Sequence, residues 1–159
     1  MSADWKLFWH PLFEERFTDL LKRVEELAER DPDGFYSHQD YKFFENVSNC
    51  IEYRIVQEPG SKEFNLGKTL GKKYKNWRRA KNGLPSRYRL FFRYSSQAEA
   101  IVLTWLNDES SIRRDGHKKD VYEVFKKMLH SNVIPNSYSE LVEKSNELDL
   151  KEEQFGSSN

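Results

Sequence analysis

Apolar residues recur every three to four positions between residues 11 and 30, which is the spacing of one face of an α-helix. The members of this stripe are Phe13, Phe17, Leu20, Leu21, Val24, Leu27 and Ala28. Pro11 suits the first turn of a helix, and the turn-forming residues 31–34 end it. The pattern therefore predicts an amphipathic helix over residues 11–30.

A second apolar stripe follows Ser37 and Asp40, a pair typical of a helix N-terminus. Its members are Phe44, Val47, Ile51 and Ile55. Because only a short polar turn separates the two stripes, we expect an N-terminal helical hairpin.

The pattern changes after residue 60 to the two-residue alternation of β-strands. Strand-like segments cover residues 77–81, 87–94 and 100–106, and their short connections favour an antiparallel meander. A third helix is expected from Asp120 to His130, and Ser137 with Glu140 predicts the start of a short last helix. The predicted fold class is therefore α+β.

Aromatic residues make up 14% of the chain, so large side chains can fill one core despite 33% charged residues. We expect a single domain over residues 1–144 and an acidic, flexible tail over residues 145–159. No apolar run approaches the length of a membrane span, and the N-terminus lacks a secretory pattern. With Cys50 as the single cysteine, these features predict a cytoplasmic protein with no membrane contact.

The charge is unevenly distributed along the chain, although the net formal charge is zero. Residues 1–60 carry −6, residues 61–130 carry +10 and residues 131–159 carry −4. Such a basic block is typical of a protein that binds a phosphate-rich partner, although a solvated basic surface is an equal alternative.

Alternation over residues 87–94 predicts that Tyr88, Leu90, Phe92 and Tyr94 share a core face, with Arg87, Arg89, Phe91 and Arg93 opposite. A row of guanidinium groups suits a phosphodiester backbone, because each arginine can donate two hydrogen bonds to the oxygens of one phosphate. The alternative is an exposed strand whose arginine stems cover apolar surface.

Further cations precede this strand and are candidates for RNA binding together with Arg87. They are Lys72, Lys73, Lys75, Arg78, Arg79 and Lys81. Tyr74 and Trp77 lie among them and are candidate surfaces for base stacking.

Residues 107–122 join a strand to a helix and hold the side chains that RNA cleavage through the 2′-hydroxyl would need. Asp108, Glu109 and His117 are candidate acids or bases, whereas Arg113, Lys118 and Tyr122 could stabilise the phosphate or the nucleotide. Each has an ordinary structural alternative, such as an ion pair or a core-edge aromatic ring, and Asp120 is a candidate helix cap. No histidine or carboxylate spacing predicts a metal site.

Three longer segments carry a family resemblance. They are WHPLFEERFTDLLKRVEEL at residues 9–27, LGKTLGKKYKNWRRAKNGLPSRYRLFFRYS at residues 66–95 and WLNDESSIRRDGHKKDVYEVFKKML at residues 105–129. Together they resemble the YhaV family of bacterial type II toxins, and the match covers roughly residues 5–144.

The resemblance implies a RelE-like fold, with helices packed on a small twisted antiparallel sheet. It also implies metal-independent cleavage of mRNA, often at the ribosome, with no cofactor. The expected partner is a PrlF-type antitoxin, and operator DNA is expected to bind only the complex with this antitoxin.

By the same resemblance, Arg89 is similar to a phosphate-stabilising arginine and Tyr122 to a catalytic or base-stacking tyrosine. Arg113 and Lys118 resemble basic residues that replace a histidine base, and we expect Arg93 beside the same phosphate. The resulting hypothesis is a toxin that is an endoribonuclease, which attacks phosphate with the 2′-hydroxyl. A non-catalytic module that binds RNA or the ribosome is the main alternative, and a DNA-binding regulator is less favoured because no helix-turn-helix pattern carries the basic block.

Overall fold

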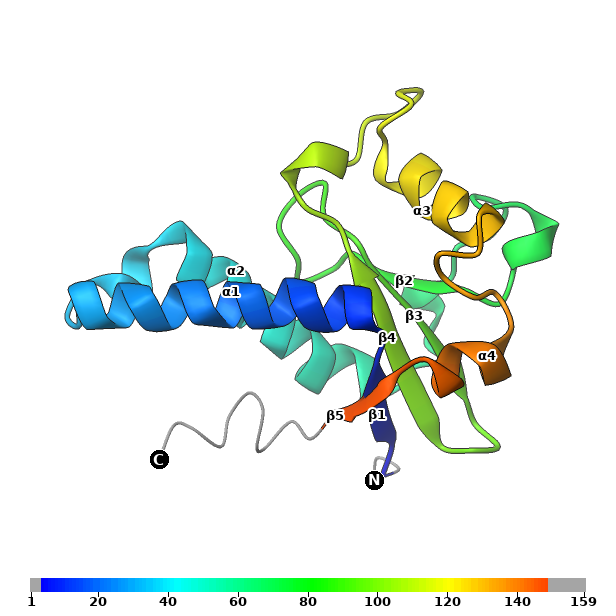
Figure 1. Cartoon of the computed structure of the whole chain (residues 1–159), viewed down its shortest axis with the longest axis horizontal. Helices are drawn as coiled ribbons and strands as arrows, with labels where there is room; N and C mark the ends of the chain where they lie inside the picture. Colours follow the sequence, from blue (N-terminus) through cyan, green and yellow to red (C-terminus); the bar gives the residue numbers. More distant parts are fainter. Residues whose placement is uncertain (1–3, 149–159) are drawn as a thin grey trace.

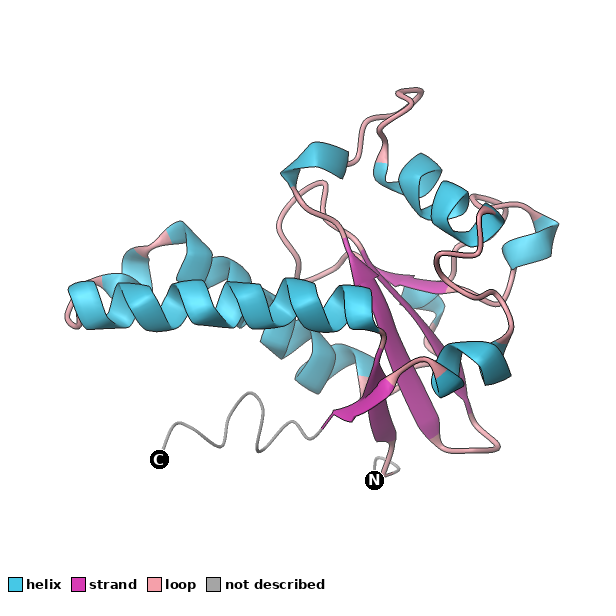
Figure 2. Cartoon of the chain, in the orientation of Figure 1, coloured by secondary structure: helices cyan, strands magenta, loops and turns pink. Residues whose placement is uncertain are grey.

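The computed structural model describes residues 4–148, in which helices cover both faces of a five-stranded sheet (Figures 1 and 2). The α-helices are α1 (Pro11–Arg30), α2 (Gln39–Cys50), α3 (Val121–His130) and α4 (Tyr138–Glu143). The strands are β1 (Lys6–Trp9), β2 (Arg78–Ala80), β3 (Leu90–Ser95), β4 (Ala100–Leu106) and β5 (Asn146–Leu148). The predicted α+β class is confirmed. No helix in the described part of the chain is long and apolar enough to cross a membrane.

The sheet is mixed, with the strand order β2-β3-β4-β1-β5. Strands β2, β3 and β4 form the predicted antiparallel meander, but β1 pairs with β4 in parallel. Strand β5 pairs with β1 and follows residue 144, where the sequence predicts a tail. Both unpredicted strands have four residues or fewer, which is too short for an alternation signal. The rest of the predicted tail, residues 149–159, lies outside the described residues.

Helix α1 packs Phe13 and Phe17 of its predicted apolar stripe into the core on the sheet, and its first turn is capped by a buried histidine. The Nδ1 atom of His10 accepts a hydrogen bond from the Leu12 amide at 3.1 Å. Burial and the nearby charge of Lys144 lower the pKa of His10, which favours the neutral ring that this cap requires. His38 caps α2 in the same way, so the capping residue of the second helix lies one position after the predicted Ser37.

A hydrophobic core lies on each face of the sheet, and this corrects the predicted arrangement of β3. The core under α1 and α2 includes Phe13, Phe17, Val47, Ile51, Leu90 and Phe92. The core under α3 and α4 includes Phe91, Val102, Tyr122, Phe125, Leu129 and Leu141. Phe91 is fully buried and stacks on Phe125 with ring centroids 4.0 Å apart. The prediction of one solvated arginine face was therefore wrong, because α3 covers that face.

The residues before β3 depart from strand geometry. Arg87 has a φ of 73°, so the strand begins only at Leu90 and the predicted row of arginines is interrupted. Arg87 is exposed, whereas Arg89 and Arg93 are half-buried at the two ends of the second core. The three guanidinium groups therefore occupy three different environments.

The side chain of Asn107 holds this irregular segment in place from the end of β4. Its Oδ1 atom accepts from the Arg89 amide at 2.8 Å, and its Nδ2 atom donates to the Ser111 and Arg87 carbonyls at 2.9 and 3.2 Å. The Asn107 carbonyl accepts two further hydrogen bonds from the Arg16 guanidinium of α1. Because Asn107 is fully buried, the Arg89 amide and the Ser111 carbonyl would lose this partner without its side chain, whereas the Arg87 carbonyl would keep the Arg113 amide.

Replacement of Asn107 by alanine should lower the free energy of unfolding by about 3 kcal/mol, because the Arg89 amide and the Ser111 carbonyl lose their partner and the Arg87 carbonyl loses one of two donors. Urea unfolding followed by circular dichroism measures this loss. Asn49→Ala, at an exposed position of α2, is the matched control and should change stability by less than ~0.5 kcal/mol. Equal stability of the two variants would contradict the role given to Asn107.

Candidate active site around Tyr122

Tyr122 lies in the first turn of α3 with its ring buried between the helix and the sheet. Its side chain is 6% exposed, and its ring packs edge-on against Phe91 at 5.8 Å. The Asp120 side chain caps the helix by accepting from the Tyr122 amide at 3.0 Å. Both the ring and the backbone of Tyr122 are therefore fixed, and the residue borders a surface cavity beside α3.

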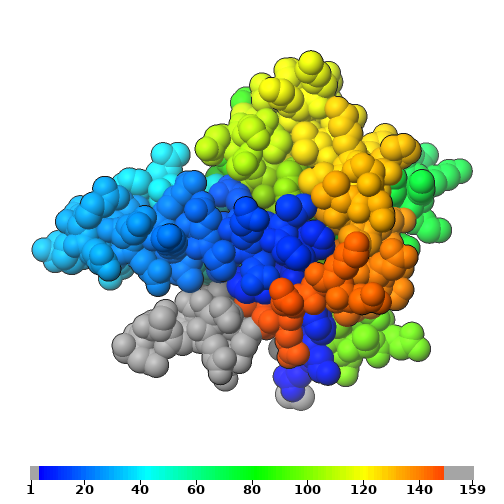
Figure 3. Space-filling view, in the orientation of Figure 1, coloured from blue at the N-terminus to red at the C-terminus, as the bar shows by residue number. Residues whose placement is uncertain are grey.

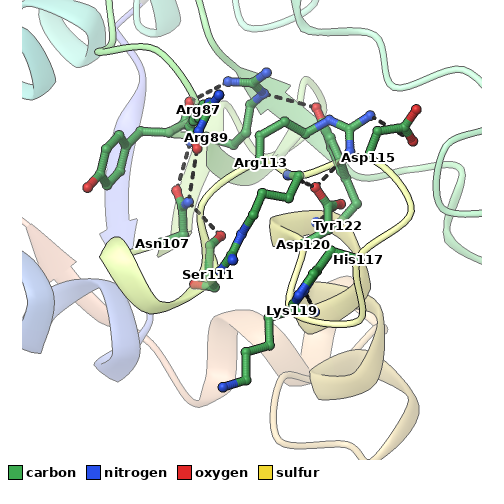
Figure 4. Close-up of polar contacts among 12 residues, drawn as sticks. Arg87, Arg89, Asn107, Ser111, Arg113, Asp115, His117, Lys119, Asp120 and Tyr122 are labelled. Carbon is green, nitrogen blue, oxygen red and sulfur yellow. Dashed lines mark hydrogen bonds and ion pairs between the residues drawn. The ribbon is translucent and has the colours of Figure 1, made fainter.

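Three arginines from separate segments surround Tyr122 (Figure 4). The Tyr122 hydroxyl oxygen accepts a hydrogen bond from Arg79 of β2 at 3.0 Å and another from Arg89 at 3.1 Å. The guanidinium of Arg113 lies 5.2 Å from the centroid of the tyrosine ring. With both acceptor positions of its oxygen in use, the hydroxyl retains its hydrogen for donation to a further group.

Asp120 holds Arg113 in this position. Its carboxylate accepts from Arg113 Nη1 at 2.7 Å and from the Arg114 amide at 2.5 Å, as Figure 4 shows for Arg113. Burial alone would raise the pKa of Asp120, but these hydrogen bonds and the Arg113 charge hold that pKa below its usual value. The same hydrogen bond raises the pKa of Arg113. Asp120 is therefore a helix cap and an anchor for Arg113, and its oxygens are already in use.

The loop that carries Arg113 is attached to the segment before β3. The Arg113 amide donates to the Arg87 carbonyl at 2.9 Å, and Asn107 binds both Arg87 and Ser111. The sequence suggests that Arg113 joins Arg89 only when RNA bridges them. The structure corrects this expectation, because Arg113 already contacts Tyr122 in the protein alone.

A surface cavity of about 380 Å³ opens beside Tyr122 and Arg113. Lys118, His117 and Glu123 also line it, and all three side chains are exposed. The Nδ1 atom of His117 accepts from the Lys119 amide at 3.0 Å, so the neutral ring carries its hydrogen on Nε2 and presents a donor. Lys118 and His117 therefore supply positive or donor groups at the rim.

The remaining predicted catalytic residues lie elsewhere. Arg93 contacts the rings of Trp77 and Tyr138 at the opposite end of β3. Asp108 and Glu109 line a different cavity with residues of α1, and Asp108 caps the short 3₁₀ turn over Glu109–Ser111. The structure thus groups Arg89, Arg113, Lys118 and Tyr122, with His117 at the rim of the same cavity, but separates Arg93, Asp108 and Glu109 from them.

The predicted RNA-binding cations fall into two groups. Lys72, Lys73, Lys75, Lys81 and Arg87 are exposed around β2 and β3, whereas Arg78 and Arg79 are half-buried. The prediction that Tyr74 and Trp77 offer stacking surfaces was wrong, since they are only 4% and 1% exposed. The indole N–H of Trp77 donates to Asn136 Oδ1 at 2.9 Å, and its ring packs on Phe125.

Sequence reasoning placed Arg79 among the surface cations and missed its contact with Tyr122. It also missed Asn107. This residue directly follows the buried strand β4, and its position could have indicated its role, because a buried polar side chain needs hydrogen-bond partners. Within residues 4–148, Arg79 and Arg89 form no ion pair, whereas Arg113 is paired with Asp115 and Asp120. In the same residues no group of three His, Cys, Asp or Glu side chains is placed to hold a metal ion.

Asp120→Asn should lower the free energy of unfolding by about 2 kcal/mol at pH 7, because it removes a charged acceptor of three hydrogen bonds. The pKa of Asp120 is lowered in the fold, so its contribution is present above the unfolded value of ~3.9 and is lost as the pH falls through the folded value. Urea titrations of both proteins between neutral and acidic pH should therefore converge at low pH. A stability difference that stays constant into the acid range would contradict this role for the charge.

Comparisons with known proteins agree with a nuclease site. Residues 7–146 match the model of a family described as a toxin with endonuclease activity, of a toxin–antitoxin system. The chain is 40% identical over 144 residues to the ribonuclease toxin YhaV of Escherichia coli strain K12 and to the toxin YhaV of Escherichia coli O6:H1. Each alignment covers 90% of this chain and 93% of the relative. No solved structure matches the chain. The chain therefore belongs to the YhaV family of toxins with endonuclease activity from toxin–antitoxin systems.

Proposed function

We propose that this toxin is an endoribonuclease that cleaves mRNA at the site around Tyr122. The observation that carries the proposal is the Tyr122 hydroxyl, which two guanidinium groups hold while a third covers its ring. A related toxin from Escherichia coli K12 is named a ribonuclease, which supports RNA as the substrate. The +10 charge of residues 61–130 favours a polyanion in the same way.

In this proposal the site accelerates cleavage mainly by stabilising negative charge on the phosphate. Arg79 and Arg89 retain guanidinium donors that can bind the phosphoryl oxygens of a nucleotide placed over Tyr122. Arg113 and Lys118 line the cavity that Tyr122 borders and can hold the same phosphate. Negative charge increases on the phosphate as it is attacked, so fixed cations stabilise the transition state more than the bound substrate.

The proposed reaction is an internal transesterification. The 2′-oxygen forms a bond to the neighbouring phosphorus, and the bond from phosphorus to the 5′-oxygen breaks. Tyr122 donates its hydroxyl hydrogen to the departing 5′-oxygen, and the 2′-hydroxyl proton leaves to water in the open cavity. The products are a 2′,3′-cyclic phosphate and a 5′-hydroxyl. Because arginine and lysine supply the positive charge, this reaction requires no metal ion.

The same positive charge suits inhibition by an acidic partner. We propose a PrlF-type antitoxin that places carboxylates or a packed segment over Arg87, Arg89 and Lys118, which would neutralise the site and exclude RNA together. The family resemblance supports this partner type, a RelE-like core, action in the cytoplasm at the ribosome, and operator binding only through the complex. Association should weaken as salt is added.

Arg89→Ala should reduce the cleavage rate by ~10²–10³, since it removes a cation directed at the scissile phosphate. The measurement is cleavage of total RNA at saturating substrate, with and without ribosomes and with a chelator present. Arg30→Ala, an exposed arginine at the far end of α1, removes the same charge and should leave the rate unchanged. A folded Arg89 variant with full activity would remove this residue from the site.

Tyr122→Phe should lower the rate at saturating RNA by ~10²-fold while binding of 2′-deoxy substrate is retained, because only the proton donor is removed. Tyr53→Phe, at a position with 65% exposure, is the matched control. This pair also tests the main alternative, a module that binds RNA or the ribosome without cleaving it. If wild type and both variants bind RNA equally and none yields cyclic phosphate ends, the enzyme proposal fails and the alternative stands.

A further inference from the structure

A second basic cavity lies at the opposite end of β3 from Tyr122. It has a volume of about 470 Å³ and is bordered by the Ser95–Gln97 turn between β3 and β4. In Figure 1 this turn lies below α4, whereas the loop carrying Arg113 lies at the other end of the sheet. Lys75, Arg78 and Arg93 line the cavity, and none of its lining residues is acidic. We refer to it as the turn cavity.

Arg93 is held rigidly in the wall of the turn cavity. One of its terminal nitrogens donates to the Asn136 carbonyl, and its guanidinium lies 5.5 Å from the Trp77 ring and 5.8 Å from the Tyr138 ring. Its Nε atom is buried without a hydrogen-bond partner among the described residues. Burial lowers the pKa of Arg93, which reflects the cost of keeping this charge away from water.

Arg78 has a matching arrangement on the neighbouring strand β2. Its Nη2 atom donates to the Ser61 carbonyl at 2.7 Å, and its guanidinium lies 5.5 Å from the Tyr94 ring. Within residues 4–148 neither Arg78 nor Arg93 forms an ion pair. Two oriented and partly desolvated cations without a carboxylate are costly, and a bound anion would offset that cost.

We infer that the turn cavity binds a backbone phosphate of RNA, at a distance from the phosphate that is cleaved. This inference rests on the proposed function, because it takes the RNA that Tyr122 cleaves as the ligand. Arginine donors and the neighbouring Lys75 fit a phosphodiester, which offers several acceptor oxygens and one charge per nucleotide.

The position of the turn cavity favours RNA over an acidic peptide. Arg78 and Arg79 are adjacent in the edge strand β2, yet Arg78 lines the turn cavity and Arg79 binds the Tyr122 hydroxyl. Residues 89 and 93 are ~13 Å apart along β3, a distance that a single strand of RNA covers within a few nucleotides. A chain with regularly repeated phosphates can therefore occupy both places at once, following the β2 edge.

The test compares binding of single-stranded 2′-O-methyl RNA, which lacks the attacking hydroxyl, across a series of salt concentrations. The double variant Lys75→Gln and Arg78→Gln should weaken binding of a long oligonucleotide about tenfold and reduce the salt slope by ~0.7 for each lost phosphate contact. A dinucleotide, which cannot reach both places, should bind the variant and wild type alike. On cleavable RNA the double variant should raise KM by more than it lowers kcat.

Two further variants serve as controls for this test. Arg30→Gln is the matched control for lost charge and should leave the salt slope unchanged. Arg93→Lys keeps the charge and the aromatic packing but loses the planar guanidinium. It should therefore weaken binding of the long RNA more than binding of the dinucleotide. This variant keeps the inference testable even if the double variant folds poorly.

An unchanged salt slope in the double variant, together with unchanged binding of long RNA by Arg93→Lys, would overturn the inference. So would variants that bind RNA normally but lose the antitoxin, because the turn cavity would then be a protein-binding site. Failure of the proposed function gives a different result: wild type would bind long RNA with the expected salt slope but produce no cyclic phosphate ends.

Discussion

The buried carboxamide of Asn107 is the interaction on which the arrangement of the site depends. It joins the end of β4 to the segment that carries Arg89 and to the loop that leads to Arg113. At that point the chain has left β4, has not yet entered β3 and forms only the short 3₁₀ turn over Glu109–Ser111, so hydrogen bonds to a single side chain replace a strand ladder. The Arg16 contact extends the same network to α1, and in this way the first helix supports a site it does not reach.

Two cores give this network a rigid base. Strand β4 is buried on both faces, with Ile101 and Leu103 in one core and Val102 in the other. Phe91 and Trp105 of the sheet stack with Phe125 of α3, and the Phe91 ring also packs against Tyr122. A tyrosine held this firmly has little freedom to move away from Arg79 and Arg89, and such preorganisation is what stabilisation of a charged transition state requires.

The charge blocks of the sequence become separate parts of the molecule. Figure 3 shows residues of α1 and α2 extending to one side, whereas residues 61–130 gather on the other side and at the top. Residues 1–60, which include both helices, carry −6, and residues 61–130 carry +10. Asp120 is an exception within the basic part, and both of its oxygens are used to position Arg113 and to cap α3. Arg79 and Arg89 keep their charge available, which suits a polyanionic substrate.

The sequence alone determined the helices and the location of the basic block, because a helical stripe and a charge excess are properties of neighbouring residues. It also indicated Arg89, Arg113, Lys118 and Tyr122, although it gave Arg93 the same role. Only the tertiary structure decided which arginines meet Tyr122: Arg79 lies 43 residues and Arg89 33 residues away along the chain. The burial of Phe91, the parallel pairing of β1 with β4 and the isolation of Arg93 also depend on elements distant in sequence. Alternation along one strand defines two faces, but the elements that pack on the strand decide which face remains open to solvent.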